Sequence, residues 1–226
     1  MEGWIAYMSA GLALVASHVV LSAPQMRETL RRKLGPAGFI ALHSTVSTAA
    51  LAAFVVTFLA AETGPQLFVS SLAMRWLALV LMPLAVFGAL CRLSTRARRG
   101  DTLLAPSGIY RIARTPGSLA ILLWTALHMA NTGDARRLAA FAIMALIALW
   151  AIVKNEIVLA RSADDAAGAW RRETSLVPGL ALVRYGASGL GREIGWLRPA
   201  AALAAFVALV AFHPLVIGPN PLQGLF

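Results

Sequence analysis

Charged residues are spaced so widely along this chain that long apolar runs lie between them. The uncharged runs cover residues 3–26, 34–61, 76–91, 115–133, 138–153 and 199–226. A helix needs roughly 20 apolar residues to cross a hydrocarbon core about 30 Å thick. The third and fifth runs reach that length when the helix also includes Arg75 and Lys154. The pattern therefore predicts about six membrane-spanning helices.

Turn and cap signals refine these spans, which we place at about 4–22, 38–61, 72–91, 116–133, 138–158 and 199–218. Thr115-Pro116 predicts a helix start, with a hydroxyl N-cap and proline at the first helical position. Asn131, Thr132 and Gly133 predict a tight turn, so the fourth and fifth spans should form an antiparallel hairpin. The expected fold is an all-α polytopic membrane helix bundle, with residues 1–226 forming a single transmembrane domain.

The only long loop is expected over residues 159–198. Its stretch AWRRETSLVPGLALV predicts a short amphipathic segment on the membrane surface. The N-terminal stretch has no lysine or arginine before its apolar run, whereas a secretory signal has a basic start. We therefore interpret it as an uncleaved first span.

Composition agrees with this class, because 59% of the 226 residues are hydrophobic and the mean hydropathy is +0.73. Soluble domains are nearer 45–50% apolar. Cys91 is the only cysteine, so the chain contains no internal disulfide and no thiolate metal cluster.

The net charge of +10 is explained by topology rather than by nucleic-acid binding. Residues 23–37 hold four of the 20 lysines and arginines, and residues 92–114 and 161–198 hold six each. These three segments are the odd-numbered loops. The positive-inside rule places them in the cytoplasm and both termini on the periplasmic side. The expected partner of this charge is membrane lipid.

All four histidines lie inside predicted spans: His18, His43, His128 and His213. Ionisable residues in spans are costly and usually face the bundle interior. By helical rise, His18 and His43 lie about 7 and 10 Å to the cytoplasmic side of their span centres. His128 and His213 lie roughly 6–7 Å toward the outer side. The histidines therefore form an inner and an outer layer of two.

Two histidines from facing helices commonly hold a b-type haem through axial imidazoles. His18 with His43, or His128 with His213, fits the need for ligands at similar depth. Arg75 can pair with a propionate of an outer haem or extend to the interface. The structural alternative is that each histidine is a neutral imidazole bonded to a neighbouring helix.

Other chemistry has less support. A closed zinc site takes four ligands, and each layer offers two histidines. Lys154 and Glu156 are two residues apart, so they do not share a helix face. The sequence contains no nucleotide-binding, nucleophile-elbow or HExxH motif.

Four stretches resemble the NnrU family: SHVVLSAPQMRETLRRKLGPAGFIALHSTVS, GIYRIARTPGSLAILLWTALHMANTGD, WRRETSLVP and FHPLVIGPNPL. They occur in the family's order and span nearly the whole chain. The resemblance implies a bacterial inner-membrane protein linked to denitrification and nitric oxide metabolism, with respiratory or denitrification proteins as partners. The family is itself similar to 15-cis-ζ-carotene isomerase, an integral membrane enzyme that uses haem b.

The resemblance carries over residue by residue to His18, His128 and His213. The family usually has Arg-His-Pro where this chain has Arg114-Thr115-Pro116. Thr115 cannot ligate haem iron as an imidazole would. One hypothesis is that His43, where the family more often has an aromatic residue, replaces the lost partner of His18. The rival is that the inner site is degenerate and only the outer pair matters.

The resemblance leaves several functions open. The first is a haem-binding protein of nitrogen-oxide metabolism. The second is a haem-dependent isomerase or redox enzyme acting on a carotenoid or another hydrophobic polyene. A shorter resemblance, to isoprenylcysteine-type membrane methyltransferases, and a non-catalytic scaffold are the remaining alternatives.

Overall fold

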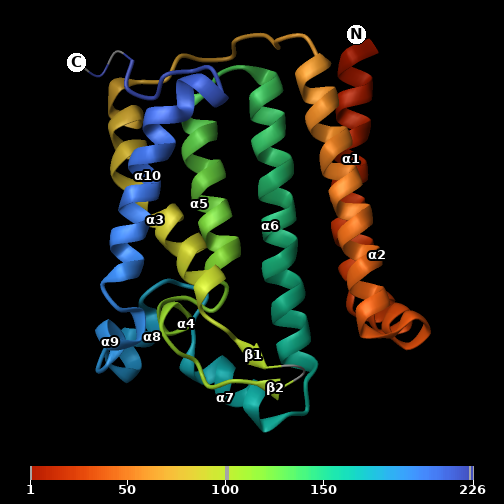
Figure 1. Cartoon of the computed structure of the whole chain (residues 1–226), viewed down its shortest axis with the longest axis vertical. Helices are drawn as coiled ribbons and strands as arrows, with labels where there is room; N and C mark the ends of the chain where they lie inside the picture. The colour runs from red at the N-terminus through yellow and green to blue at the C-terminus, as the bar shows by residue number, and fades with distance from the viewer. Residues whose placement is uncertain (1, 100–101, 224, 226) are drawn as a thin grey trace.

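The long helices of the computed structural model run side by side, and their axes are close to one direction (Figure 1). The structure describes residues 2–99, 102–223 and 225. Both chain ends lie at one end of the bundle, here named the terminal end, and the short elements lie at the other, the loop end. The elements are α1 (Glu2–Ser22), α2 (Pro24–Ala60), α3 (Leu72–Ser94), β1 (Arg98–Arg99), β2 (Thr102–Leu103), α4 (Ile109–Ile112), α5 (Pro116–Asn131), α6 (Ala135–Arg161), α7 (Asp165–Glu173), α8 (Leu180–Tyr185), α9 (Leu190–Ile194) and α10 (Leu197–Val216).

The all-α membrane class is confirmed. Within the described residues, five helices are long and apolar enough to cross a membrane: α1, α2, α3, α6 and α10. α5 has 16 residues, fewer than the roughly 20 of a full span, but it lies beside α3 and α6. The sixth span and the placement of the termini outside the cell stay predictions. α5 and α6 run antiparallel around the turn at residues 132–134, as expected.

One half of the bundle is built from α1, α2 and α6, which pack on one another. Tyr7 is fully buried between these helices and stacks on Phe54 with ring centroids 5.3 Å apart. Its hydroxyl donates a 2.9 Å hydrogen bond to the Arg136 carbonyl. A Cβ at Gly11 would lie 2.5 Å from Ile143 Cδ1. Small residues allow such close approach of membrane helices.

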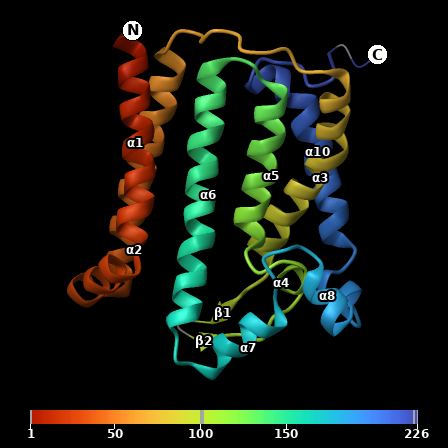
Figure 2. The same ribbon diagram turned by 180° about the vertical axis from the view of Figure 1, so that it is seen from behind.

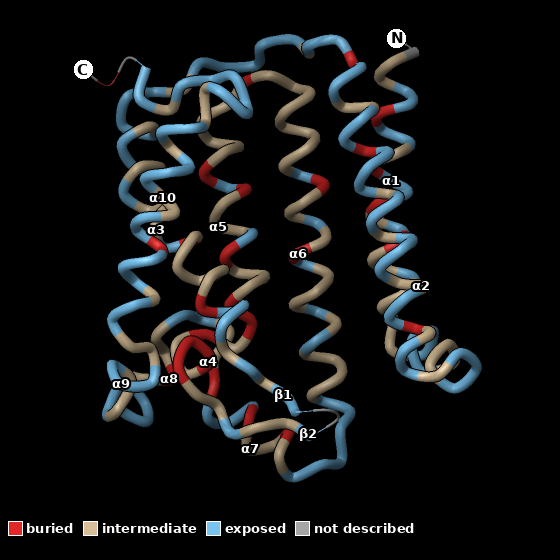
Figure 3. Tube along the Cα trace, in the orientation of Figure 1, coloured by how far each residue is buried: buried red, intermediate tan, exposed pale blue. Residues whose placement is uncertain are grey.

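The other half contains α3, α5 and α10, with α3 packed on both of the others (Figure 2). α5 and α6 join the two halves. Buried positions follow these contacts, while the outward faces are exposed (Figure 3). Large exposed side chains such as Leu12, Val80 and Leu209 lie on spanning helices. This distribution suits contact with lipid hydrocarbon.

α2 bends sharply near its start. Gly35 has φ +71° and ψ 170°, and Pro36 follows it. Residues 24–34 therefore turn away from the axis of the spanning part, beyond the end of α1 (Figure 1). The predicted span start at residue 38 is two residues after Pro36.

The amphipathic segment expected over residues 169–183 is divided in the structure between two short helices. α7 ends at Glu173, and α8 begins at Leu180. Trp170 is buried against Tyr110, with ring centroids 5.2 Å apart. The apolar side of α7 thus packs on protein, with Cys91 and Ile109 in the same cluster.

Candidate functional site

The inner histidine layer exists as a pair. His18 of α1 and His43 of α2 have ring centroids 6.0 Å apart, with an interplanar angle of 72°. His18 Nδ1 lies 3.0 Å from the Leu14 carbonyl oxygen. The His43 ring stacks on Phe39 at 5.8 Å and 19°. Both rings are half-buried, so the fold brings together two imidazoles that are 25 residues apart in the sequence.

The outer histidines lie near the terminal end but are less closely paired. His128 Nδ1 is 2.8 Å from the Trp124 carbonyl, and its ring packs on Trp124 and Phe141 at 4.9 and 4.6 Å. His213 Nδ1 is 2.6 Å from the Pro219 carbonyl. The two histidines are within electrostatic range of each other. The ring contacts that the structure gives His128 are thus to aromatic neighbours.

Three of the histidines share one hydrogen-bonding arrangement. A carbonyl oxygen can only accept, so Nδ1 of His18, His128 and His213 carries the proton in each case. In the neutral ring this leaves Nε2 with a free lone pair. Metal-ligating histidines characteristically bond their other nitrogen to a backbone carbonyl or carboxylate in this way. Each of these three rings therefore offers Nε2 as a ligand nitrogen.

His43 differs, because its Nδ1 is buried without a hydrogen-bond partner among the described residues. A buried polar atom without a partner costs roughly 1–3 kcal/mol. Within residues 2–99, 102–223 and 225, no three His, Cys, Asp or Glu side chains converge as a metal site. A metal site built from these histidines would therefore have at most two histidine ligands among the described residues.

Arg75 lies in the first turn of α3. Its Nη1 donates a 2.9 Å hydrogen bond to the Gln223 carbonyl. It therefore ties the C-terminal segment to α3, a role that the sequence did not suggest. Whether it also meets a propionate stays a prediction.

α5 begins at Pro116 with Thr115 at the N-cap position, as predicted, but the Thr115 hydroxyl makes no capping hydrogen bond, so that part of the prediction is wrong. The residue is 6% exposed, and its Oγ1 has no hydrogen-bond partner among the described residues. Its backbone, at φ −125° and ψ 61°, holds the hydroxyl inside the protein. The position where the family usually has histidine is thus a buried polar position.

Arg114 links several helices through its side chain, and the sequence analysis did not single it out. Its Nη1 forms a 2.6 Å ion pair with Glu156 of α6. Nε donates to Thr174 Oγ1 at 2.9 Å, and Nη2 donates to the carbonyls of Arg171 and Thr174, both at 2.8 Å. One guanidinium therefore joins the start of α5 to the ends of α6 and α7. The Arg-x-Pro and WRRETS stretches were the available signal.

Lys154 and Glu156 point to different surroundings, as their spacing predicted. Glu156 pairs with Arg114, whereas Lys154 is within electrostatic range of Arg27 and His43. Lys154 has no hydrogen bond or ion pair within the described part of the chain. The inner histidine pair thus has a positive neighbour on α6.

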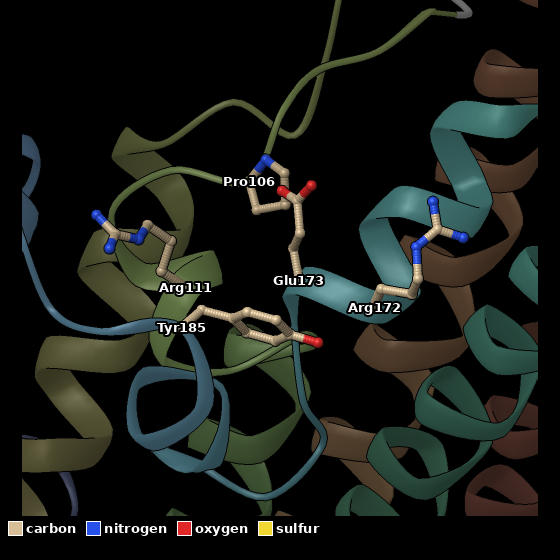
Figure 4. Close-up of a pocket in the computed structure, with 5 residues that line it drawn as sticks. All are labelled: Pro106, Arg111, Arg172, Glu173 and Tyr185. Carbon is tan, nitrogen blue, oxygen red and sulfur yellow. The ribbon is translucent and has the colours of Figure 1, made fainter.

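The loop end also contains a cavity of about 460 Å³ lined by Pro106, Arg111, Arg172, Glu173 and Tyr185 (Figure 4). None of the histidines lines it. Arg111 is held by a 2.6 Å ion pair with Glu193, whose other oxygen accepts from the Gly108 amide at 2.6 Å. These bonds tie α4 to α9.

The helices, the lipid-compatible surface and the buried polar groups define a polytopic α-helical membrane protein. Within that class, the sequence matches the family described as NnrU protein over residues 7–221. The chain belongs to the NnrU family. No curated protein and no solved structure matches the chain.

Proposed function

We propose that this NnrU-family chain is a haem b protein of the bacterial inner membrane that serves nitrogen-oxide metabolism, with His18 and His43 as the residues that would hold the haem. The single observation that carries the proposal is the pairing of these two rings at 6.0 Å. The family resemblance supplies the link to denitrification.

The geometry suits two ligands on one iron. His18 and His43 come from two helices that pack on each other, and their ring centroids are 6.0 Å apart, so both imidazoles could contact one haem. The Leu14 carbonyl holds His18 in the tautomer that leaves Nε2 free. Haem bound there would supply a one-electron redox centre within the membrane.

The surrounding residues position this pair. Phe39 supports the His43 ring by stacking, and Ser22, one helical turn after His18, accepts a 2.9 Å hydrogen bond from Trp150 Nε1 of α6. That bond fixes the end of α1 against α6. Because His18 lies in the same final turns, its depth in the bundle is fixed too.

The test is the visible spectrum of the purified full chain from a haem-replete bacterial host. We expect a reduced-minus-oxidised α-band and a pyridine haemochrome of b type. His18→Ala and His43→Ala should each remove that band, because each deletes one of the two histidines that would hold the haem. His128→Ala and His213→Ala are the matched controls and should retain it.

Two results would overturn this assignment. Protein without a haem spectrum would favour the scaffold alternative. A band that survives in His18→Ala and His43→Ala but is lost in His128→Ala or His213→Ala would place the ligands in the outer layer.

Nitric oxide accumulation during anaerobic growth on nitrate, in cells with and without the gene, tests the proposed role in nitrogen-oxide metabolism. Carotenoid profiles of the same cells test the polyene alternative.

A further inference from the structure

A hollow lies at the loop end between the first turns of α2 and the last turns of α6. Its volume is about 640 Å³, and four arginines line it: Arg27, Arg31 and Arg32 of α2 and Arg161 of α6. Glu28 is the only carboxylate among its lining residues. The hollow therefore presents an excess of positive charge from two helices that are far apart in sequence.

The bend at Gly35 creates this hollow. Because Pro36 starts the spanning part of α2, residues 24–34 lie outside the span (Figure 1). Val158 and Arg161, in the last turn of α6, line the same hollow. Arginines at the ends of spanning helices lie at the height of lipid headgroups. The hollow is thus at the membrane surface.

Neighbouring residues add positive charge without adding acid. Lys154, two turns before Arg161 on α6, is within electrostatic range of Arg27, and no carboxylate pairs with its ammonium in the described part of the chain. Glu156, the nearest acid in sequence, is already paired with Arg114. Lys154 does not itself line the hollow, but its charge adds to the positive potential that an anion bound there would meet.

We infer that this hollow binds the phosphate headgroup of an anionic phospholipid. A lipid fits better than a soluble anion because the same segment exposes apolar side chains, with Met26 41% and Leu34 48% exposed. An amphipathic segment at the surface combines such apolar contacts with arginine–phosphate bonds. The inference does not depend on haem binding.

The experiment is native mass spectrometry of the delipidated full chain, titrated with phosphatidylglycerol or phosphatidylcholine of matched acyl chains. We expect phosphatidylglycerol to bind roughly tenfold more tightly, and Arg27→Gln/Arg31→Gln/Arg161→Gln to remove that preference. Lys33→Gln is the matched control, because Lys33 lies on the same segment and is exposed but does not line the hollow. Arg161→Gln alone, at the exposed end of α6, provides a milder variant if the triple variant does not fold.

Several results would overturn the inference. An equal loss of preference in Lys33→Gln would show general attraction of surface charge. Binding of glycerol phosphate as tight as that of the lipid would show a soluble-anion site. Loss of haem absorbance with unchanged phosphatidylglycerol preference in the triple variant would assign the arginines to a cofactor. Absence of haem from the wild-type chain bears only on the proposed function.

Discussion

At the scale of single residues, Arg114 has the most consequential contacts of the loop end. All three guanidinium nitrogens, Nε, Nη1 and Nη2, donate hydrogen bonds. The side chain that pairs with Glu156 is only 11% exposed. Replacement leaves the Glu156 carboxylate and the Thr174 carbonyl without this donor. Because the partners lie on α6, on α7 and at the C-cap of α7, while Arg114 itself precedes α5, the effect belongs to the whole loop end.

We expect Arg114→Ala to lower the free energy of unfolding by about 3 kcal/mol, the cost of removing one member of a buried ion pair. Arg114→Lys should restore part of the loss, because the ammonium keeps the charge but not the planar fork of donors. Unfolding in mixed micelles measures both. Arg172→Gln, on the same α7 region, is the control, and an equal loss there would contradict the role of the Arg114 contacts.

Thr115 gives the opposite prediction. Its buried hydroxyl has no hydrogen-bond partner among the residues that the structure describes, and an unpaired buried polar group costs roughly 1–3 kcal/mol. Thr115→Val keeps the shape and removes the hydroxyl, so we expect it to raise the free energy of unfolding by about 1 kcal/mol. The same micelle assay measures this. A clear loss of stability would instead mean that the hydroxyl has a partner in the membrane-bound protein.

At the scale of elements, the bend in α2 rests on one backbone conformation. Gly35 has φ +71°, and a Cβ there would meet nothing within 4 Å. The penalty of Gly35→Ala is therefore conformational, roughly 1–2 kcal/mol. Gly191→Ala is the control, because its Cβ is equally unobstructed and its φ is not positive. Limited proteolysis of residues 24–34 and unfolding midpoints should separate the two variants, and equal stability would contradict the prediction.

The link between α4 and α9 should depend on pH. The Gly108 amide and then Arg111 favour the charged carboxylate and lower the pKa of Glu193 below its usual value. A carboxyl group with a lowered folded-state pKa contributes stability above its unfolded value, about 4.3 for glutamate, and the contribution is lost as the pH falls further.

Glu193→Gln should accordingly be less stable than the wild type at pH 7, and the difference should shrink as the pH falls below about 4. Thermal unfolding in detergent at several pH values measures the difference. Glu62→Gln, in an exposed loop at the terminal end, is the control. A difference that stays constant with pH would show that the carboxylate charge is irrelevant.

Charge spacing was enough to predict the long helices, because a charged residue is costly within a membrane span. The turn between α5 and α6 was also predictable, since Asn-Thr-Gly cannot continue a helix well. The contacts of Arg114 could not be predicted, because its partners Glu156 and Thr174 lie 42 and 60 residues away in the sequence. Only the close packing of α1 on α2 shows that His18 and His43 are neighbours. The Thr115 hydroxyl is without a hydrogen-bond partner among the described residues because other elements bury it. The Thr-Pro sequence carries no information about that burial.

At the scale of the whole molecule, both chain ends lie at one end of the bundle and α7–α9 at the other. The positive-inside rule assigns the terminal end to the periplasm. Cys91 is fully buried, so cysteines introduced at exposed sites should be the only reactive thiols.

We expect Thr63→Cys to react with a membrane-impermeant maleimide in intact spheroplasts, and Ser162→Cys only in inverted vesicles. Both positions are exposed, in loops at opposite ends of the bundle. A mass shift of the purified chain measures the labelling. Labelling of both from the same side would contradict the placement of these two loops at opposite ends of a membrane-spanning bundle.

The division of the bundle into two halves has a consequence for its synthesis. α1 and α2 leave the ribosome first, but their partner α6 begins only at Ala135. At roughly 5–20 residues per second, the interval is on the order of ten seconds. During that time the Tyr7 hydroxyl lacks the Arg136 carbonyl that accepts from it in the finished protein. Until α6 is inserted, the Tyr7 hydroxyl of the nascent α1–α2 hairpin therefore needs a hydrogen-bond partner from the insertion machinery or from water at the interface.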